Sequence, residues 1–198
     1  MFGAQIGIRA LTISVGALAL HENAVADAVT SRLRDAAYPI LALERASRWT
    51  ATDPPDGPSP YMQQLVKDLL GPAMAATAVE RAVPATGGGL SARIVTALLE
   101  ALLAHLLDAC ARISPQGAQR LQADVAYMGN FLATHPSAQP GGAALAQLPV
   151  FERAARVLQF LLPVRLSMSE VESAGVVLPD AAQWLACRAR SERTFGFC

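Results

Sequence analysis

His105 and Asp108 are the first pair of residues in this 198-residue chain whose types and spacing could do chemistry. They are one helical turn apart, so a metal ion could bind both of them. Two ligands are too few for a protein metal site, which usually has three or four. His105 also lies in a leucine-rich stretch, which favours a buried, hydrogen-bonded histidine. We therefore expect no metal site.

Three further patterns resemble catalytic or phosphate-binding motifs but lack essential residues. The segment 12–16, TISVG, resembles a nucleophile elbow without its first glycine. The glycines at 87–89 are not followed by Gly-Lys-Ser/Thr, so they do not form a phosphate loop. Glu170 and Glu172 are two residues apart and would point in different directions on a helix. The sequence thus predicts no catalytic residues and no cofactor, and we expect that the protein is not an enzyme.

The composition is that of a chain that buries much of its surface. Hydrophobic residues make up 53% and charged residues 16%, against about 25% charged in typical domains. Basic and acidic residues number 16 each, whereas nucleic-acid binders normally carry a basic excess. We therefore predict protein partners and no nucleic acid.

Cysteine usage and the apolar N-terminal stretch bear on location. The three cysteines are far apart and odd in number, which indicates no disulfide framework and favours a reducing compartment. The stretch 6–20 is apolar but contains Arg9, and it is shorter than the roughly 20 residues of a membrane span. We predict a cytoplasmic protein without a transmembrane segment, in which any membrane association is peripheral and occurs only through partners.

The stretch 90–132 organises the rest of the chain. It reads as two amphipathic helices, 90–113 and 114–132, with Ser114 suited to an N-cap and Pro115 to the first helical position. The short joint predicts that the two helices pack as an antiparallel hairpin. Spacings of four, three and four residues place one apolar stripe on the second helix: Leu121, Val125, Met128 and Leu132.

The N-terminal part predicts helices before a proline-rich loop. Residues 1–21 read as one helix or a broken pair, and Asn23 can cap a following helix that Pro39 should kink or end. The loop 50–60, TATDPPDGPSP, is the best candidate boundary. It separates N-terminal helices at 1–49 from a C-terminal helical domain at 50–198. The expected apolar stripe of the capped helix is Val25, Val29, Leu33 and Ala36.

Further helices are expected towards the C-terminus. One begins at Pro60 or Tyr61 and should break at Gly71-Pro72, and a last one places Trp184 inwards. We predict an all-α fold, an elongated or stacked antiparallel bundle of roughly six to eight helices. The helix 148–162 has an expected inner face of Phe151, Ala154, Ala155, Leu158 and Leu162.

Four segments in this order resemble the C-terminal region of the coiled-coil domain-containing protein 142 family. They are PSPY leading into LVKDLLGP, ISPQGAQRLQADVAYMGNFL, LPVFERAARVLQFLL, and QWLACR at 183–188, and the resemblance covers about residues 49–198. The pattern Ser-x-x-Gly-Ala-x-x-Leu-x-x-Asp is also similar, more weakly, to the last helices of Golgi and exocyst-type helical-rod tethering subunits. Its residues here are Ser114, Gly117, Ala118, Leu121 and Asp124.

The resemblance implies the end of a helical rod and no known activity. The family's proteins are much longer, so residues 1–49 are expected to be the remainder of a longer rod. The residues themselves suggest that Gly117 and Ala118 allow a close helix approach, and that Asp124 bonds to a facing backbone or to Arg120. The predicted structural or interface residues are Ser114, Gly117, Ala118, Leu121, Asp124, Val125, Met128 and Trp184.

The leading functional hypothesis is a non-catalytic helical scaffold or tether-type subunit that binds other proteins. The alternative is a helical module for a small molecule or lipid, in which the helix 90–113 lines a cavity. A closed apolar pocket of several hundred Å³ would favour that alternative.

Overall fold

A computed structural model describes residues 2–42, 49, 56–78, 89–108, 113–139, 141–162, 178 and 180–193, with the side chains of 2–21, 137 and 188–193 left out. Every element in these residues is helical, which confirms the all-α prediction. The elements are α1 (Phe2–Ala42), α3 (Pro60–Leu65), the π-helical turn η1 (Val66–Leu70), α4 (Gly71–Ala76), α6 (Leu90–Asp108), α7 (Pro115–Thr134), the 3-10 turn η2 (Pro136–Ala138), α8 (Gly142–Leu145), α9 (Pro149–Leu161) and α11 (Ala181–Arg193).

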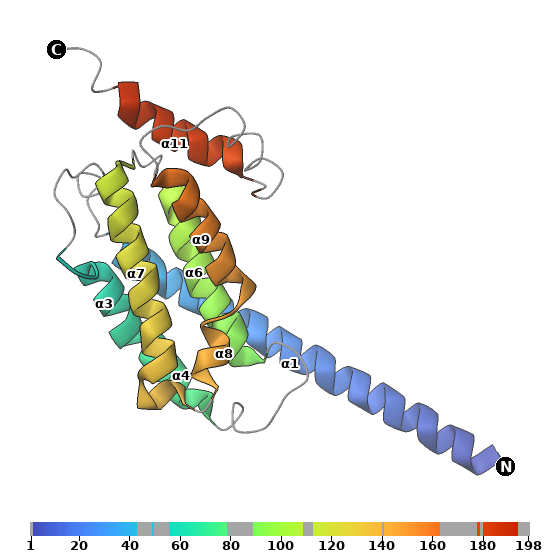
Figure 1. Cartoon of the computed structure of the whole chain (residues 1–198). Coiled ribbons are helices and arrows are strands. Elements are labelled where there is room, and N and C mark those ends of the chain that lie inside the picture. The colour runs from blue at the N-terminus through green and yellow to red at the C-terminus, as the bar shows by residue number, and fades with distance from the viewer. Residues whose placement is uncertain are drawn as a thin grey trace.

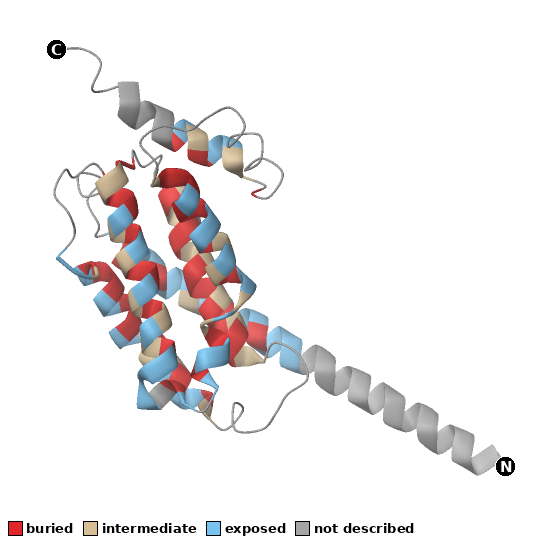
Figure 2. Cartoon of the chain, in the orientation of Figure 1, coloured by how far each residue is buried: buried red, intermediate tan, exposed pale blue. Residues whose placement is uncertain are grey.

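Helix α6 lies at the centre of the bundle (Figure 1). It contacts α1, α4, α8, α9 and α11, and its buried residues surround the helix, as is typical of a core helix. Helices α7 and α9 lie in front of it and run in opposite directions, while α11 crosses one end (Figure 1). Buried residues line the inward faces of these helices (Figure 2).

Among the described residues, α6 is the one helix long and apolar enough to span a membrane by length and composition. However, 56% of its most apolar window is buried inside the fold. The core helix of a soluble bundle meets the same criteria.

Helices α6 and α7 share one core but do not form the directly packed hairpin predicted for 90–113 and 114–132. The most extensive backbone contacts of α6 are with α1, and those of α7 are with α8 and α9. Helix α9 contacts both α6 and α7. Helices α6 and α7 are therefore antiparallel without being nearest neighbours.

Helix α1 is continuous, so the prediction that Asn23 caps a second helix was wrong. Asn23 lies inside the helix, and Pro39 is also within it, three residues before its end at Ala42. Pro39 is exposed, so its ring faces away from the packed side. The helix is 41 residues long, about 60 Å at 1.5 Å per residue, and its N-terminal part runs beyond the other helices (Figure 1).

The buried face of α1 is rotated relative to the predicted stripe. Val25 is 47% exposed and Ala36 is exposed, whereas Val29 and Leu33 are partly buried. Small residues occupy the centre of the contact because the backbones of α1 and α6 approach closely. Within residues 22–42, the part of α1 whose side chains are described, the buried residues are Ala26, Thr30, Ala37, Ile40 and Leu41.

The predicted break at Gly71-Pro72 was also wrong, because the chain stays helical from Pro60 to Ala76 through the π turn η1. The Gly71 N–H donates to the Val66 carbonyl, five residues back. In a regular α-helix, Pro72 would clash with the carbonyl four residues earlier. The wider turn before Pro72 changes that spacing, and it keeps Leu65, Leu70 and Met74 all in the core.

The expected inner face of 148–162 was partly right. Ala154 and Leu158 are buried, Phe151 and Leu162 are partly buried, and Ala155 is exposed. Helix α9 is contacted by α6, α7 and α11, so it buries a broader set than a single stripe. That set is Val150, Ala154, Val157, Leu158, Phe160 and Leu161.

Candidate functional site: a buried carboxylate and the groove between α1 and α6

The carboxylate of Asp124 on α7 is fully buried. Its Oδ1 accepts a hydrogen bond of 2.6 Å from the Ser59 N–H, and its Oδ2 accepts one of 2.6 Å from the Tyr61 hydroxyl. Ser59 is the N-cap residue of α3 and makes no side-chain cap itself. Asp124 therefore places a negative group at the N-terminus of α3, where the helix dipole favours it.

Burial raises the pKa of Asp124, because a charged carboxylate loses its hydration inside the core. The hydrogen bonds from Tyr61 and Ser59 and the nearby Arg120 guanidinium oppose this rise in the pKa. Bonding of Asp124 to a facing backbone N–H confirms one of the two contacts expected from the sequence. Both carboxylate oxygens are thus engaged in joining α7 to the start of α3.

The backbone of Trp49 packs directly against Gly117. A Cβ on Gly117 would lie 2.2 Å from the Trp49 carbonyl oxygen, closer than any real contact. The same oxygen accepts a hydrogen bond of 2.8 Å from the Ser114 N–H. Ser114 is the N-cap of α7 as predicted, and its hydroxyl accepts from the Gly117 N–H at 3.0 Å. The small residue therefore allows close approach, although the approaching group is a single backbone carbonyl rather than a helix.

The predicted residues fall into three places. Ser114, Gly117 and Asp124 fasten Trp49 and the Ser59–Tyr61 segment to α7. The remaining residues of α7 face the core, namely Ala118, Leu121, Val125 and Met128. Trp184 is fully buried on α11, away from this contact, and its Nε1 has no hydrogen-bond partner among the described residues.

Trp49, Ser59, Tyr61 and Gly142 were missing from the predicted site residues. The Trp49 and Tyr61 rings lie 6.2 Å apart between centroids, and neither shows a local signal for this pairing. A Cβ on Gly142 would lie 1.8 Å from the Leu132 carbonyl oxygen. Gly142 follows Gly141 in a stretch with two prolines, so no local signal singled out one of the two glycines.

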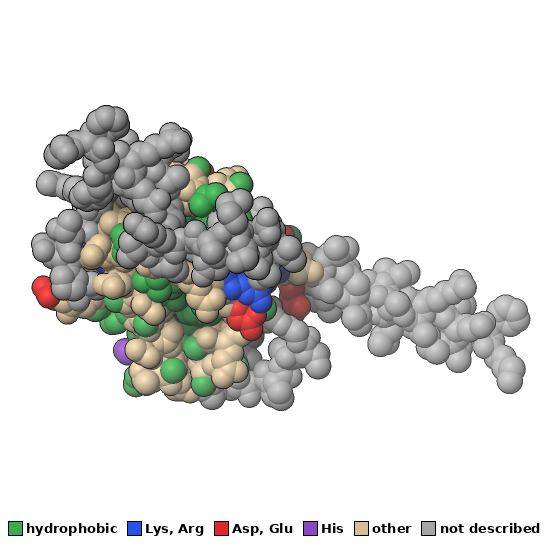
Figure 3. Space-filling view, turned by 45° about the horizontal axis from the view of Figure 1, so that its top comes forward, with side chains coloured by type: hydrophobic (Ala, Val, Ile, Leu, Met, Phe, Trp, Pro, Cys, Tyr) green, Lys and Arg blue, Asp and Glu red, His purple; other side chains and the backbone are tan. Residues whose placement is uncertain are grey.

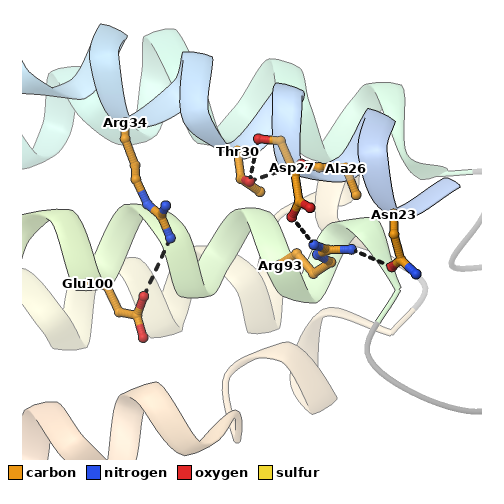
Figure 4. Close-up of polar contacts among 7 residues, drawn as sticks. All are labelled: Asn23, Ala26, Asp27, Thr30, Arg34, Arg93 and Glu100. Carbon is orange, nitrogen blue, oxygen red and sulfur yellow. Dashed lines mark hydrogen bonds and ion pairs between the residues drawn. The ribbon is translucent and has the colours of Figure 1, made fainter. Parts of the chain in front are cut away.

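A second feature is an open groove of about 490 Å³ between α1 and α6. We call it the α1–α6 groove. Helices α1 and α6 run in the same direction along it (Figure 4). It is lined by Asp27, Thr30, Arg34, Ala92, Arg93, Thr96, Ala97 and Leu148.

Polar contacts bridge the two helices beside the groove (Figure 4). Arg93 donates from Nη1 to the Asn23 Oδ1 at 2.9 Å and pairs through Nη2 with Asp27. Further along, Arg34 Nη2 lies 3.6 Å from Glu100 Oε2. From one contact to the next, the residue numbers increase on both α1 and α6. The contacts therefore hold the two helices in a parallel register.

His105 continues this series of contacts. Its ring meets Tyr38 edge-on, with centroids 5.8 Å apart, and it is partly buried rather than fully buried. Burial lowers the pKa of His105, and the Asp108 carboxylate opposes this by raising it. Among the described residues, no three His, Cys, Asp or Glu side chains gather to hold a metal ion.

Few charged side chains of the described residues show on the face drawn in Figure 3. A basic and an acidic patch lie side by side near its centre, and another acidic group lies apart at one edge. This distribution agrees with the even balance of charges in the sequence.

Comparison with known proteins gives a match to one family. The model of the coiled-coil protein 142 family matches residues 27–196. No curated protein and no solved structure matches the chain. The match begins at the part of α1 that packs on α6 and includes every residue of the Asp124 and Gly117 contacts. Because it covers most of the sequence, the chain belongs to the coiled-coil protein 142 family.

Proposed function

We propose that the chain is a non-catalytic helical scaffold subunit, of the kind found in tethering assemblies, that acts in the cytoplasm by binding other proteins. The observation that carries the proposal is that buried polar groups form hydrogen bonds between segments of the bundle. Asp124 bonds to the Ser59 N–H and the Tyr61 hydroxyl, and the Ser114 N–H bonds to the Trp49 carbonyl, so these groups join α7 to two segments far away in the sequence. A protein that devotes these groups to fixing helix positions presents a rigid surface to its partners.

The exposed part of the α1–α6 pair supports the same proposal. It combines Arg34, Tyr38 and Glu100 with a neighbouring groove, and Tyr and Arg are the residue types that contribute most to protein interfaces. The alternative, a small-molecule or lipid site, requires a closed apolar pocket. The α1–α6 groove is open and has charged side chains at its rim, so it favours a protein partner.

The test is reconstitution of a complex from purified components. Proteins that co-purify with the full-length protein from cells would be identified by mass spectrometry, expressed separately and mixed with it. We expect at least one partner to form a complex of fixed stoichiometry in size-exclusion chromatography with light scattering. A hydrolase, transferase or nucleotide-binding activity that maps to this chain would contradict the proposal.

A further inference from the structure

We propose that the α1–α6 groove is a docking site for an acidic amphipathic helix of a partner protein. This inference rests on the proposed scaffold function and names the surface and the chemistry of the partner. It depends on the shape of the groove, on its charge and on the exposed residues beside it.

The shape fits a helix. The groove follows two parallel helices, from Asp27 to Arg34 on α1, which is about 10 Å or two helical turns. Its floor consists of small side chains, Ala92 and Ala97, which are buried, while Leu148 provides a third wall. Small floor residues leave room for one or two aliphatic side chains from an incoming helix, as in other helix-in-groove complexes.

The charge favours an acidic occupant. Arg93 already bonds to Asn23 and Asp27. Among the residues that the structure describes, Arg34 has only the 3.6 Å approach of Glu100, and the two side chains are 51% and 42% exposed. A guanidinium has five N–H donors, so Arg34 can bind a further carboxylate without losing an established hydrogen bond.

The N-terminus of α9 adds to this bias. Leu148, which lines the groove, is the N-cap residue of α9 and makes no side-chain cap. The partial positive charge at a helix N-terminus favours a nearby anion.

Tyr38 supplies an anchor next to the groove. It is 65% exposed, lies one turn beyond Arg34 on α1, and is held edge-on by His105. A helix lying along the groove would cover its ring. The partner therefore carries a carboxylate for Arg34 and an aliphatic side chain one turn away for the alanine floor.

The test is selection from a random helical-peptide library displayed on phage, with the full chain as bait. The variant Thr96→Trp serves for counter-selection, because Thr96 lines the groove and is only partly buried. Circular dichroism would show that this variant folds. We expect the selected peptides to carry Asp or Glu one turn from Leu, Ile or Met, and not to bind Thr96→Trp.

Charge reversal then tests the role of Arg34. In fluorescence anisotropy, Arg34→Glu should weaken peptide binding roughly tenfold or more, because it replaces attraction by repulsion. Arg32→Glu is the matched control, since Arg32 is exposed on α1 but does not line the groove. It should leave the affinity within about twofold, as expected for a charge outside the contact.

Several outcomes would overturn the inference. They are recovery of no groove-dependent peptide, recovery of neutral or basic peptides, equal loss of binding in Arg32→Glu and Arg34→Glu, and occupation of the groove by a second copy of this chain. If any of these occurred while the reconstituted complex still formed, the scaffold function would stand and only the docking site would be wrong.

Discussion

Asp124 and Gly117 lie two turns apart on α7 and attach two different segments to the same helix. Asp124 binds the Ser59–Tyr61 segment through its carboxylate. Gly117 leaves room for the Trp49 carbonyl, at a place where a side chain would collide with it. The first contact depends on the carboxylate of Asp124, and the second depends on the lack of a side chain at Gly117. Substitutions at the two positions should therefore destabilise the protein for different reasons.

Replacing Asp124 by alanine should destabilise the protein by about 3 kcal/mol, because the Ser59 N–H and the Tyr61 hydroxyl would stay buried without their acceptor. Tyr61→Phe removes one donor and leaves the carboxylate bonded to Ser59, so its cost should be smaller. Urea denaturation followed by circular dichroism measures both. Equal stability of Asp124→Ala and the wild type would show that the contact contributes nothing.

Asp124→Asn isolates the charge, because it keeps the shape of the side chain. The pKa of Asp124 is raised above its ordinary value of about 3.8 in the folded protein, so the unfolded chain releases this proton at lower pH. Between the two pKa values the folded protein binds more protons, and its free energy of unfolding falls as pH rises. Relative to Asp124→Asn, the wild type should thus lose stability as pH rises from about 3.8 through the raised pKa, and then level off. A difference between the two proteins that is independent of pH would contradict the raised pKa.

Gly117→Ala should cost about 1–3 kcal/mol, since the new Cβ would force the Trp49 carbonyl away from α7. Gly129→Ala is a matched control on the same helix. Its Cβ would lie 3.7 Å from Phe151 Cε1, an ordinary contact. There the better helix propensity of alanine should raise the free energy of unfolding by roughly 0.5–1 kcal/mol. Thermal denaturation of the two variants should shift in opposite directions.

Residue spacing located these two positions but did not identify what contacts them. The pattern from Ser114 to Asp124 lies within one helix, so its periodicity shows which side chains face inwards. Trp49, Ser59 and Tyr61 come from segments far away in the sequence. Their positions depend on the path of the whole chain, which local patterns do not encode.

At the scale of elements, α7 is the helix that the sequence predicted best. Ser114 caps it, Pro115 occupies its first position, and Leu121, Val125, Met128 and Leu132 are all buried. Each of these features is local to the helix, and each of them agrees with the others. Such agreement between capping and periodicity is what makes an element predictable.

Leu121→Asp tests the inner face of α7. Leu121 is fully buried, and an unpaired carboxylate there costs several kcal/mol, so we expect the variant to unfold or to express only as aggregates. Gln122→Asp changes the next, exposed residue of α7 and should melt within a few degrees of the wild type. Similar melting of the two variants would show that the assigned face is wrong.

Helices α1 and α3–η1–α4 were predicted less well, for two physical reasons. Asn23 is a good capping residue only where the preceding chain is not helical, and α1 is already helical there. Pro72 ends a helix only where the carbonyl four residues back obstructs it, and the π turn changes that spacing. The buried face of α1 was missed because small residues, Ala26, Thr30 and Ala37, form the contact with α6, and their hydrophobic signal is weak.

At the scale of the whole molecule, the packing of α1 on α6 completes the core. Leu99, Leu103 and Leu106 of α6 are buried, as are Ala37 and Ile40 of α1. The ion pairs that flank the contact are exposed to solvent and should contribute less than about 1 kcal/mol each. Burial of the apolar face of α6 should therefore dominate the attachment of α1. The predicted division at residues 49 and 50 falls partly outside the described residues and stays a prediction.

Ala37→Asp should loosen the packing of α1 on the rest of the bundle, including α6, because Ala37 is fully buried and a carboxylate there would be desolvated. Ala36→Asp is the matched control, since Ala36 is the exposed neighbour on the same helix. Hydrogen exchange followed by mass spectrometry should show faster exchange along residues 90–108 in the Ala37 variant only. Unchanged exchange there would indicate that α1 does not protect α6.

The shared direction of α1 and α6 gives the molecule unlike ends. One end carries the first turns of α6 beside the α1–α6 groove, and the other is crossed by α11. A chain of such subunits joined end to end would then have a polarity, with every copy facing the same way. Because the two ends differ in shape, a partner that binds one end would not fit the other.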